Sequence, residues 1–244
     1  MQRLDKFLVN LGYGSRNEIK NIAKSGRILV NGVKVYKTDV KIDENADEII
    51  FCGEKVIFKK DIYIMLNKKA GYVTANQDNL HKTIFDLLDE KLQKMQLFAI
   101  GRLDKDTEGL LLITNDGALS HGLMSPKKHV DKVYYAEVFG EILPEHIEKF
   151  EQGVVFEDGT KCKSAKLEII ESAEISKAYV TISEGKFHQV KIMFRTINCT
   201  VSYLKRIKIA DLDLDNTLNL GEYRYLTDKE EQYLKNIAFG DKNV

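Results

Sequence analysis

The chain has 244 residues, enough for one large domain or for a small domain and a medium one, and 43% of its residues are hydrophobic. The N-terminus has no apolar signal core, no stretch approaches the length of a membrane span, and the three cysteines are widely spaced. The sequence therefore predicts a cytoplasmic protein with free thiols, without membrane contact and without a metal site. Nothing in it requires more than a monomer.

Basic residues are concentrated at the N-terminus. The net charge of the chain is zero, but residues 1–37 contain eight basic and two acidic side chains, so this part carries +6 and the remainder −6. A basic module ahead of a mildly acidic body is expected when one part docks on nucleic acid.

The N-terminal part is predicted to begin with two helices and a hairpin. Apolar residues at positions 4, 7, 8 and 11 have the spacing of an amphipathic helix that ends at Gly12. Ser15 followed by Glu18 is a capping box, which predicts a second helix that stops at Gly26. "RILVNGVKV" then predicts two short strands joined by an Asn-Gly turn.

These elements give "RLDKFLVNLGYGSRNEIKNIAKSGRILVNGVKV" a resemblance to the RNA-binding domain first named from ribosomal protein S4. The resemblance covers about residues 1–60 and implies domains at 1–59 and 60–244. It implies that the first domain grips folded RNA mainly through phosphates, although the same lysines would also suit a solvated helix face. The basic residues assigned to RNA are Arg3, Lys6, Arg16, Lys20, Lys24 and Arg27.

The remaining chain is predicted to be an α+β domain. "IYIMLNKKAGYVTA" suggests a strand, a turn and a second strand, and a short helix is expected in "HKTIFDLLDEKL". Further strands are predicted in "LFAIGRLD", "GLLLITND", "KVYYAEVFG", "KCKSAKLEII" and "AYVTISEG", and helices at 144–152, at 187–196 and after a capping box at 227–230. Because the strands follow one another without regular crossovers, a mixed, mainly antiparallel sheet flanked by helices is expected.

One polar pair stands at the edge of an apolar run. In "IGRLDKDTEGLLLITNDG" an extended backbone would place Arg102 and Asp104 on one face and Leu103 on the other. A structural Arg–Asp ion pair at a sheet rim is the simplest explanation of an isolated pair of this kind.

The wider context resembles a known family. "GRLDKDTEGLLLITNDG" is similar to the signature of bacterial ribosomal-RNA pseudouridine synthases of the RsuA group. "YIMLNKKAGYVTA", "SPKKHVDKVYYAEV" and "SEGKFHQVKIMF" resemble further motifs of this family in the same order, so that the resemblance extends from about residue 2 to 226. It implies an enzyme that isomerises uridine to pseudouridine in ribosomal RNA without a metal or organic cofactor.

The resemblance also implies roles for individual residues. Asp104 matches the catalytic aspartate, which acts on the flipped-out nucleotide as a nucleophile or by assisting glycal formation. Lys191 matches the basic residue that pairs with this carboxylate and favours its charged form. Tyr134 matches the tyrosine that stacks on the uracil, whereas Tyr135 falls on the opposite face of the strand. Arg102 is implied to hold the flipped RNA.

Other positions are assigned to RNA more loosely. Leu204 is implied to form an apolar wall opposite the tyrosine. His188 and Gln189 are expected near a helix start as RNA-binding or supporting residues. Lys127, Lys128 and Lys132 are expected to extend a phosphate track. Asp106 and Glu108, which could be mistaken for an acid/base pair, are interpreted as turn and capping residues.

The sequence departs from the family pattern at Lys69 and Ala70, at Ile192 and at Ala210, which bears on RNA contacts and loop stiffness rather than on the reaction. "HQVK" and "SPKKH" favour the small-subunit (16S) branch over the large-subunit (23S) branch. Two other classes of protein fit the sequence less well. A non-catalytic RNA-binding or assembly factor would be free to lose the aspartate, tyrosine and lysine. A hydrolase built on Asp104 lacks a second catalytic group across the chain.

Overall fold

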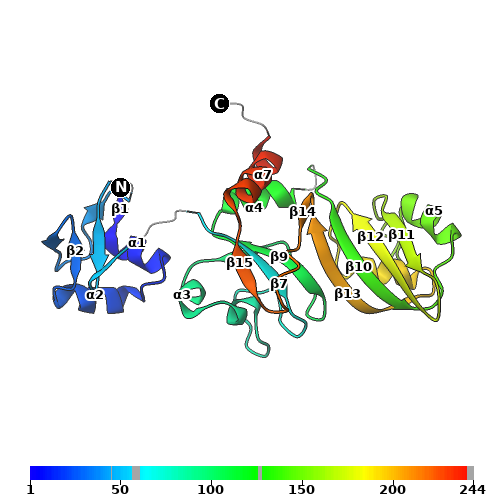
Figure 1. Ribbon diagram of the computed structural model, residues 1–244, viewed down its shortest axis with the longest axis horizontal. Helices are drawn as coiled ribbons and strands as arrows, with labels where there is room; N and C mark the ends of the chain where they lie inside the picture. Colours follow the sequence, from blue (N-terminus) through cyan, green and yellow to red (C-terminus); the bar gives the residue numbers. More distant parts are fainter. Residues whose placement is uncertain (45, 57–60, 126–127, 241–244) are drawn as a thin grey trace. The chain divides into compact units, whose positions relative to one another are not determined.

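The computed structural model describes all residues except 45, 57–60, 126–127 and 241–244, and the chain falls into two compact units (Figure 1). The first unit comprises Met1–Ile62 together with Phe85–Leu97, and the second comprises Tyr63–Ile84 and Phe98–Val244.

The first unit has two helices that share one core with a small antiparallel sheet. Helix α1 (Leu4–Asn10) and helix α2 (Arg16–Lys24) contribute their apolar faces to this core. The capping box at the start of α2 forms as predicted, because Ser15 accepts from Glu18 N and Glu18 accepts from Ser15 N. The strands are β1 (Gln2–Arg3), which pairs with β4 (Lys41–Ile42), and a four-stranded sheet of β3 (Val33–Lys34), β2 (Ile28–Val30), β5 (Ile49–Phe51) and β6 (Glu54–Lys55). The short α3 (Glu90–Gln93) also belongs to this unit.

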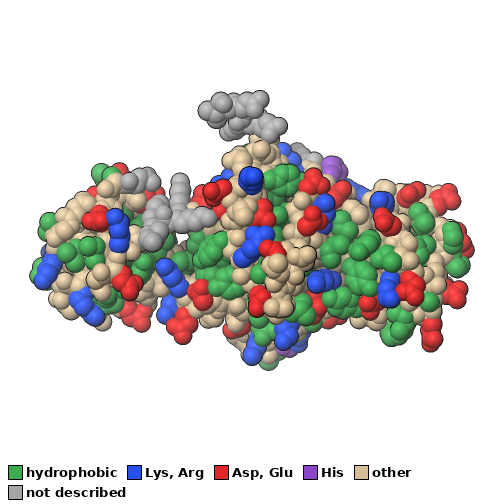
Figure 2. All heavy atoms as spheres, in the orientation of Figure 1, with side chains coloured by type: hydrophobic (Ala, Val, Ile, Leu, Met, Phe, Trp, Pro, Cys, Tyr) green, Lys and Arg blue, Asp and Glu red, His purple; other side chains and the backbone are tan. Residues whose placement is uncertain are grey.

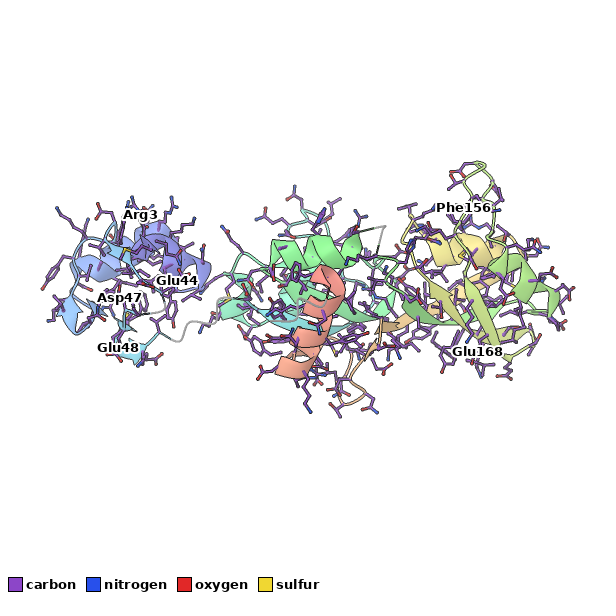
Figure 3. All side chains as sticks on the ribbon, turned by 90° about the horizontal axis from the view of Figure 1, so that it is seen from above. Arg3, Glu44, Asp47, Glu48, Phe156 and Glu168 are labelled. Atoms are coloured by element: carbon purple, nitrogen blue, oxygen red, sulfur yellow. The ribbon has the colours of Figure 1, made fainter. Side chains whose placement is uncertain are left out.

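The predicted hairpin is confirmed. Asn31 and Gly32 both have positive φ, at 50° and 77°, and they connect β2 to β3 as the sequence indicated. The Asn31 side chain also bonds to Asp47 and to the backbone N–H of Glu48, residues marked in Figure 3. The turn is therefore bonded to the residues that lead into β5, the strand that pairs with β2.

The second unit is built on one large sheet, whose nine strands among the described residues follow the order β11-β12-β10-β13-β9-β7-β15 with β14 on β13 and β8 on β9. Every pairing is antiparallel except β13 with β9, so the expected mixed, mainly antiparallel sheet is confirmed. The strands are β7 (Tyr63–Lys68), β8 (Phe98–Ile100), β9 (Glu108–Thr114), β10 (Lys132–Phe139), β11 (Lys166–Glu171), β12 (Ile175–Ile182), β13 (Thr200–Ile209), β14 (Leu212–Asp213) and β15 (Tyr223–Tyr225).

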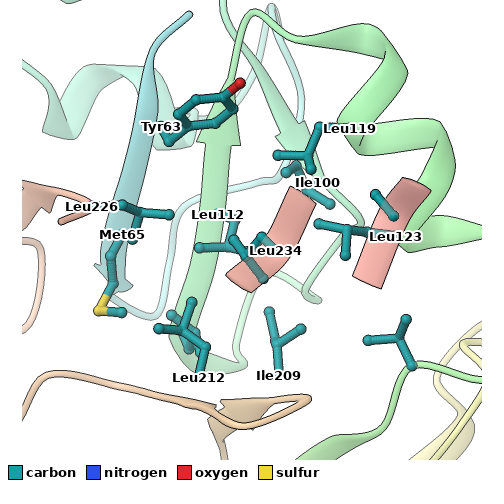
Figure 4. Close-up of a cluster of buried hydrophobic side chains, with 13 residues drawn as sticks. Tyr63, Met65, Ile100, Leu112, Leu119, Leu123, Ile209, Leu212, Leu226 and Leu234 are labelled. Atoms are coloured by element: carbon teal, nitrogen blue, oxygen red, sulfur yellow. The ribbon is translucent and has the colours of Figure 1, made fainter. Parts of the chain in front are cut away.

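Helices cover this sheet in two places. Helix α4 (Gly117–Met124) packs on α7 (Asp228–Phe239), and both bury leucines against β7 and β9 (Figure 4). Helix α5 (Glu145–Glu151) packs on β11, and α6 (Gln189–Arg195) packs on β13. The capping box at Thr227 and Glu230 that begins α7 is confirmed.

Some local predictions were wrong. The segment after Gly71 is not a strand, since Val73 forms only an isolated bridge with Thr83. The helix expected around residue 84 divides into a 3-10 turn η1 (Ile84–Leu87) and α3. Residues 101–107 form a loop rather than an extended edge, because Asp104 O accepts from Thr107 N at 3.1 Å and turns the chain.

One face of the second unit is mixed in charge, and the cysteines are unpaired. Figure 2 shows acidic and basic side chains interspersed over one face of the second unit. No helix in the described part of the chain is both long enough and apolar enough to cross a bilayer. Cys52, Cys162 and Cys199 are free thiols.

Candidate active site

A cavity of about 450 Å³ lies in the second unit between the sheet and two loops. Strands β10 and β13 provide Lys132, Tyr134, Leu204 and Arg206. The loop before β9 and the segment that leads into α6 provide the remaining walls, among them Arg102, Asp104, Glu184, Phe187, His188 and Lys191. The cavity therefore brings together residues that are up to about a hundred positions apart in the sequence.

Asp104 meets a cation in this cavity. Lys191 Nζ lies 3.1 Å from Asp104 Oδ2, and His188 Nε2 lies 3.6 Å from Asp104 Oδ1. The Asp104 side chain keeps 27% of its surface exposed and the Lys191 side chain 21%, so the pair is partly desolvated yet open to the cavity. The carboxylate is thus held by one long side chain from α6 while it lines the cavity.

Lys191 is shared between two carboxylates. Its Nζ also contacts Asp106 Oδ1 at 2.5 Å, and the Asp106 side chain is 73% exposed. Burial opposes charging of Lys191, but its bonds to Asp106 and Asp104 outweigh that effect and raise its pKa. Burial likewise opposes ionisation of Asp106, and the bond from Lys191 holds the pKa of Asp106 below its usual value. The lysine stays charged, and Asp106 holds it from the solvent side.

The loop that carries Asp104 is anchored from below by a buried lysine. Lys68, at the end of β7, is fully buried and donates to the carbonyl oxygens of Asp104 (3.0 Å), Lys105 (3.1 Å) and Thr107 (2.8 Å). Thr74 Oγ1 donates to Leu103 O at 2.8 Å on the other side of the loop. Four residues of this loop are therefore fixed through their backbone, which leaves the Asp104 carboxylate free for chemistry.

Tyr134 lies on the sheet face that forms the cavity floor. Along β10 buried and half-buried residues alternate, with Tyr134 8% exposed and facing the cavity. Tyr135 points to the other face, where its ring meets those of Tyr179 and Tyr203, as the sequence predicted. Leu204 comes from the neighbouring β13 and lines the same cavity.

Arg206 was not identified from the sequence. The pairing of β10 with β13 shifts register between Val133 and Tyr134, which places Arg206 directly opposite Tyr134. Its guanidinium donates to Leu110 O at 2.8 Å and to the Tyr134 hydroxyl at 3.4 Å. Leu204 and Arg206 are two apart on one strand, so the period of a strand would have found Arg206 once Leu204 was assigned.

An exposed aromatic ring at the cavity was also missed. Phe187 is 73% exposed and stacks on His188, with ring centroids 3.8 Å apart and planes inclined by 20°. His188 has φ 49°, a left-handed conformation that is uncommon for histidine, and it precedes the first turn of α6. The only sequence signal for Phe187 is that it is an aromatic residue beside a histidine.

Gln189 supports the site without reaching into solvent. It is 4% exposed, its side chain donates to Glu184 Oε1, and it accepts from Lys186 N. Lys186 Nζ in turn pairs with Glu184 Oε2 at 2.5 Å. Of the two roles left open for Gln189, its bonds favour that of positioning the loop before α6.

The expected phosphate track is only partly formed. Lys132 is 8% exposed and its Nζ donates to Val130 O, so it lies inside the cavity rather than along a surface track, a correction to the sequence interpretation. Strand alternation explains this, because Lys132 shares its face with Tyr134. Lys128 is exposed, and Lys127 lies outside the described residues. Arg102 is exposed and lines the cavity.

In the first unit the predicted basic side chains Lys6, Arg16, Lys20, Lys24 and Arg27 are exposed. Arg3, marked in Figure 3, is engaged differently, because two of its nitrogens bond the carboxylate of the buried Asp5 at 3.0 and 2.8 Å. This ion pair gives Arg3 a structural task that the sequence did not suggest.

Asp106 and Glu108 were interpreted as turn and capping residues. Asp106 stands in the turn after Asp104. Glu108 is 7% exposed and accepts from Ala70 N and from the Tyr203 hydroxyl, so its carboxylate secures two neighbouring segments. Among the described residues, no group of three or more His, Cys, Asp or Glu side chains is arranged to hold a metal ion.

Comparison with known proteins supports the family assignment for both parts of the chain. Residues 62–196 match the RNA pseudouridylate synthase family and residues 2–47 match the S4 domain. An uncharacterised RNA pseudouridine synthase of Bacillus subtilis is 44% identical over 93% of this chain and 96% of its own. Ribosomal small subunit pseudouridine synthase A of Vibrio parahaemolyticus is 41% identical over 93% and 97%. Ribosomal large subunit pseudouridine synthase B of Bacillus subtilis is 37% identical over 100% of both chains.

A crystal structure of a pseudouridylate synthase is 36% identical, with a TM-score of 0.68 over 96% of this chain and all of that one. The fold is that of an RNA-modifying isomerase joined to an RNA-binding module. The chain belongs to the RNA pseudouridylate synthase family and carries an S4 domain at its N-terminus.

Proposed function

We propose that this enzyme isomerises a specific uridine to pseudouridine in ribosomal RNA, and that its target lies in the small-subunit (16S) RNA. The observation that carries the reaction is the placement of Asp104, Tyr134 and Lys191 in one open cavity, with Lys191 Nζ 3.1 Å from Asp104. Family membership and the ribosomal relatives support rRNA as the substrate.

Asp104 is the group that acts on the nucleotide. Its carboxylate forms a bond to the sugar C1′ or to uracil C6, or it takes a proton from the sugar during glycal formation. Lys191 supports each of these steps, because its ammonium lies 3.1 Å from the carboxylate and holds it in the cavity. No cofactor is needed, since the uracil that leaves C1′ is the group that rejoins it through C5.

Tyr134 and Leu204 hold the base. The two side chains stand on adjacent strands of the cavity floor, where a flipped-out uracil would stack on the phenol ring and meet the leucine as a wall. Extruding a base from a stack costs a few kcal/mol. Arg102 and His188, at the cavity edge, are placed to recover this cost through the RNA backbone.

RNA affinity comes from the first unit as well. The exposed basic side chains of α2 suit phosphate contacts, which place the RNA without reading its sequence. We assign residues 1–59 to this RNA-binding domain and residues 60–244 to the catalytic domain. This boundary lies outside the described residues, and Phe85–Leu97 belongs to the first compact unit although it falls within 60–244.

Two ribosomal RNAs compete as targets. The motifs "HQVK" and "SPKKH" favour the 16S branch, as does the small-subunit relative from Vibrio parahaemolyticus. The large-subunit relative from Bacillus subtilis, 37% identical over both whole chains, makes 23S RNA the second candidate.

The test offers both RNAs to the purified enzyme. Unmodified 16S and 23S transcripts, together with precursor small-subunit particles, are incubated and pseudouridine is mapped by carbodiimide-dependent stops of reverse transcription. One new stop in 16S RNA that disappears with Asp104→Asn supports the proposal. A stop in 23S RNA alone moves the target to the large subunit. If no stop appears while RNA still binds, a non-catalytic assembly role is correct.

A further inference from the structure

Two buried cations line the cavity floor without a carboxylate of their own. Arg206 is 3% exposed and Lys132 is 8% exposed, and both line the cavity beside Tyr134. No ion pair joins either side chain to a carboxylate among the described residues. Burying a charge is costly unless something pairs with it, so this arrangement calls for a negatively charged occupant.

The carboxylates nearest the cavity are otherwise engaged. Glu184 is held by Lys186 Nζ, by Gln189 Nε2 and by the backbone N–H of Lys163. Asp104 is held by Lys191. Asp131, next to Lys132 in the chain, acts on it through space and forms no ion pair with it in the described part of the chain. The two floor cations therefore keep unused capacity for an acceptor in the cavity.

Arg206 has a donor to spare. Its Nε and Nη1 reach Leu110 O and the Tyr134 hydroxyl, whereas Nη2 is buried without a hydrogen-bond partner. The Arg206 backbone is held close to β9, because a Cβ at Gly109 would lie 2.2 Å from Arg206 O, so the strands can approach only with glycine there. Burial, followed by repulsion from Arg206, lowers the pKa of Lys132, as expected for two cations close together.

We propose that Arg206 and Lys132 form a cationic floor that stabilises the negative charge carried by the uracil ring during isomerisation. The inference rests on the proposed function and adds two catalytic residues to it. A uracil stacked on Tyr134 would have an edge near Arg206, since the Arg206 guanidinium is bonded to the phenol hydroxyl.

The chemistry places charge on the ring by every route. When the C1′–N1 bond breaks, its electron pair remains on uracil N1 and is shared with O2 and O4. If Asp104 adds instead to C6, the electron pair of the C5–C6 double bond moves toward C5 and O4. In the C6 route the C1′–N1 bond breaks from this adduct. In each case C5 then supplies the pair for the new bond to C1′, any bond from Asp104 to C1′ or C6 breaks to return the carboxylate, and the C5 proton leaves to a base. A preorganised cation that meets this charge favours the transition state over the neutral substrate.

A change in how readily the uracil ring carries negative charge distinguishes charge stabilisation by Arg206 and Lys132 from simple binding of the base. Two RNAs are prepared that differ only at the target position, which holds uridine or 5-fluorouridine, and loss of the starting nucleoside is followed in single-turnover reactions. We expect Arg206→Gln to slow the uridine RNA by ~100-fold. It should slow the 5-fluorouridine RNA by only about 10-fold or less, because fluorine itself stabilises charge on the ring.

Matched variants control for folding. Arg206→Lys keeps a charge on the floor and should recover part of the rate, and Lys132→Gln should repeat the substrate-dependent pattern. Lys205→Gln removes the same charge from the neighbouring residue, on the other face of β13, and should leave the ratio of the two substrates unchanged. Equal slowing of both RNAs by Arg206→Gln and Lys132→Gln would overturn the proposal.

A second readout does not depend on turnover. The nucleoside 6-azauridine loses its ring proton near neutral pH, whereas uridine stays neutral, and binding of both is measured by ligand-observed NMR from pH 6 to 8. The wild type should bind 6-azauridine more tightly as its ring ionises, and Arg206→Gln should lose this trend. A wild type without the trend contradicts the cationic floor even if pseudouridine is formed, whereas the trend without any modified rRNA contradicts only the proposed function.

Discussion

Lys68 Nζ donates a hydrogen bond to the backbone carbonyl of Asp104 at 3.0 Å, from a side chain that is fully buried at the end of β7. The same ammonium also holds the carbonyls of Lys105 and Thr107, so the catalytic loop depends on one cation beneath it. Charge-assisted bonds of this kind contribute more than neutral ones. The backbone that carries the Asp104 carboxylate is therefore held by a residue outside the cavity lining.

Lys68→Met should remove the ammonium that these carbonyls share, so that Asp104 O keeps the bond from Thr107 N and Lys105 O the bond from Gly71 N. We expect a loss of ~2–4 kcal/mol in the free energy of unfolding and a fall of about 100-fold in single-turnover rate, since small displacements of a reacting group are costly. Lys69→Met is the matched control, because Lys69 is exposed and only its backbone carbonyl contacts Lys68. An active Lys68→Met enzyme with normal stability would show that the loop holds itself.

Lys68 also predicts a pH dependence of stability. Burial lowers its pKa from 10.5 to about 8, against the opposing pull of Asp106, Glu108 and Asp104. Between these values the unfolded chain binds more protons at this residue than the folded chain does. The contribution of Lys68 to the free energy of unfolding therefore rises with pH over this window, by up to ~3 kcal/mol. Urea unfolding of wild type and Lys68→Met from pH 7 to 10.5 measures the difference, and parallel curves would contradict it.

Lys191 should matter far more than its second partner. Lys191→Met leaves Asp104 without its cation, and we expect single-turnover rates to fall by about 100-fold or more. Asp106→Asn should change them by less than about threefold, because the Asp106 side chain is 73% exposed and an exposed ion pair contributes little. Comparable losses in both variants would make Asp106 part of the catalytic group.

The sequence predicted the elements better than the site loop. Periodicity and capping placed α2, α7 and the Asn31–Gly32 hairpin, because these signals are local. The loop around Asp104 was expected to be extended, since strand-like apolar residues flank it on both sides. Besides the local bond from Thr107 N to Asp104 O, this turn is held by Lys68, a residue 36 positions away, and such a contact has no local pattern.

The same limit applies within the cavity. Asp104, Tyr134 and Lys191 were assigned from motifs, and the structure brings them to one cavity. The position of Arg206 directly opposite Tyr134 depends on strand pairing and on the register shift beside Tyr134. A sequence shows which residues alternate along one strand, but it does not show which residue of the next strand lies opposite.

Phe187 is predicted to act as a stacking surface for an RNA base next to the flipped uridine. It lines the cavity, is 73% exposed and is backed by His188 at 3.8 Å. Stacking of a base on an aromatic side chain contributes about 1–3 kcal/mol. Phe187→Ala should therefore weaken RNA binding by roughly 5- to 100-fold in a filter-binding titration, whereas Phe187→Tyr should bind like the wild type. Unchanged affinity in the alanine variant would mean that the ring stays in solvent.

The basic face of α2 should govern how RNA binding responds to salt. Arg16, Lys20 and Lys24 are exposed and spaced four apart on one helix, which suits contacts to successive phosphates. Each phosphate contact contributes about 0.7 to 0.9 to the slope of log affinity against log salt. Replacing all three residues by Gln should therefore lower that slope by about two to three. Thermal unfolding should barely change, because these side chains form no core contact in the first unit.

The measurement is a set of RNA titrations between 50 and about 300 mM KCl. Lys55→Gln serves as the control, because the Lys55 ammonium pairs with Glu48. A slope equal to that of the wild type would show that this face stays hydrated and that the RNA is held elsewhere.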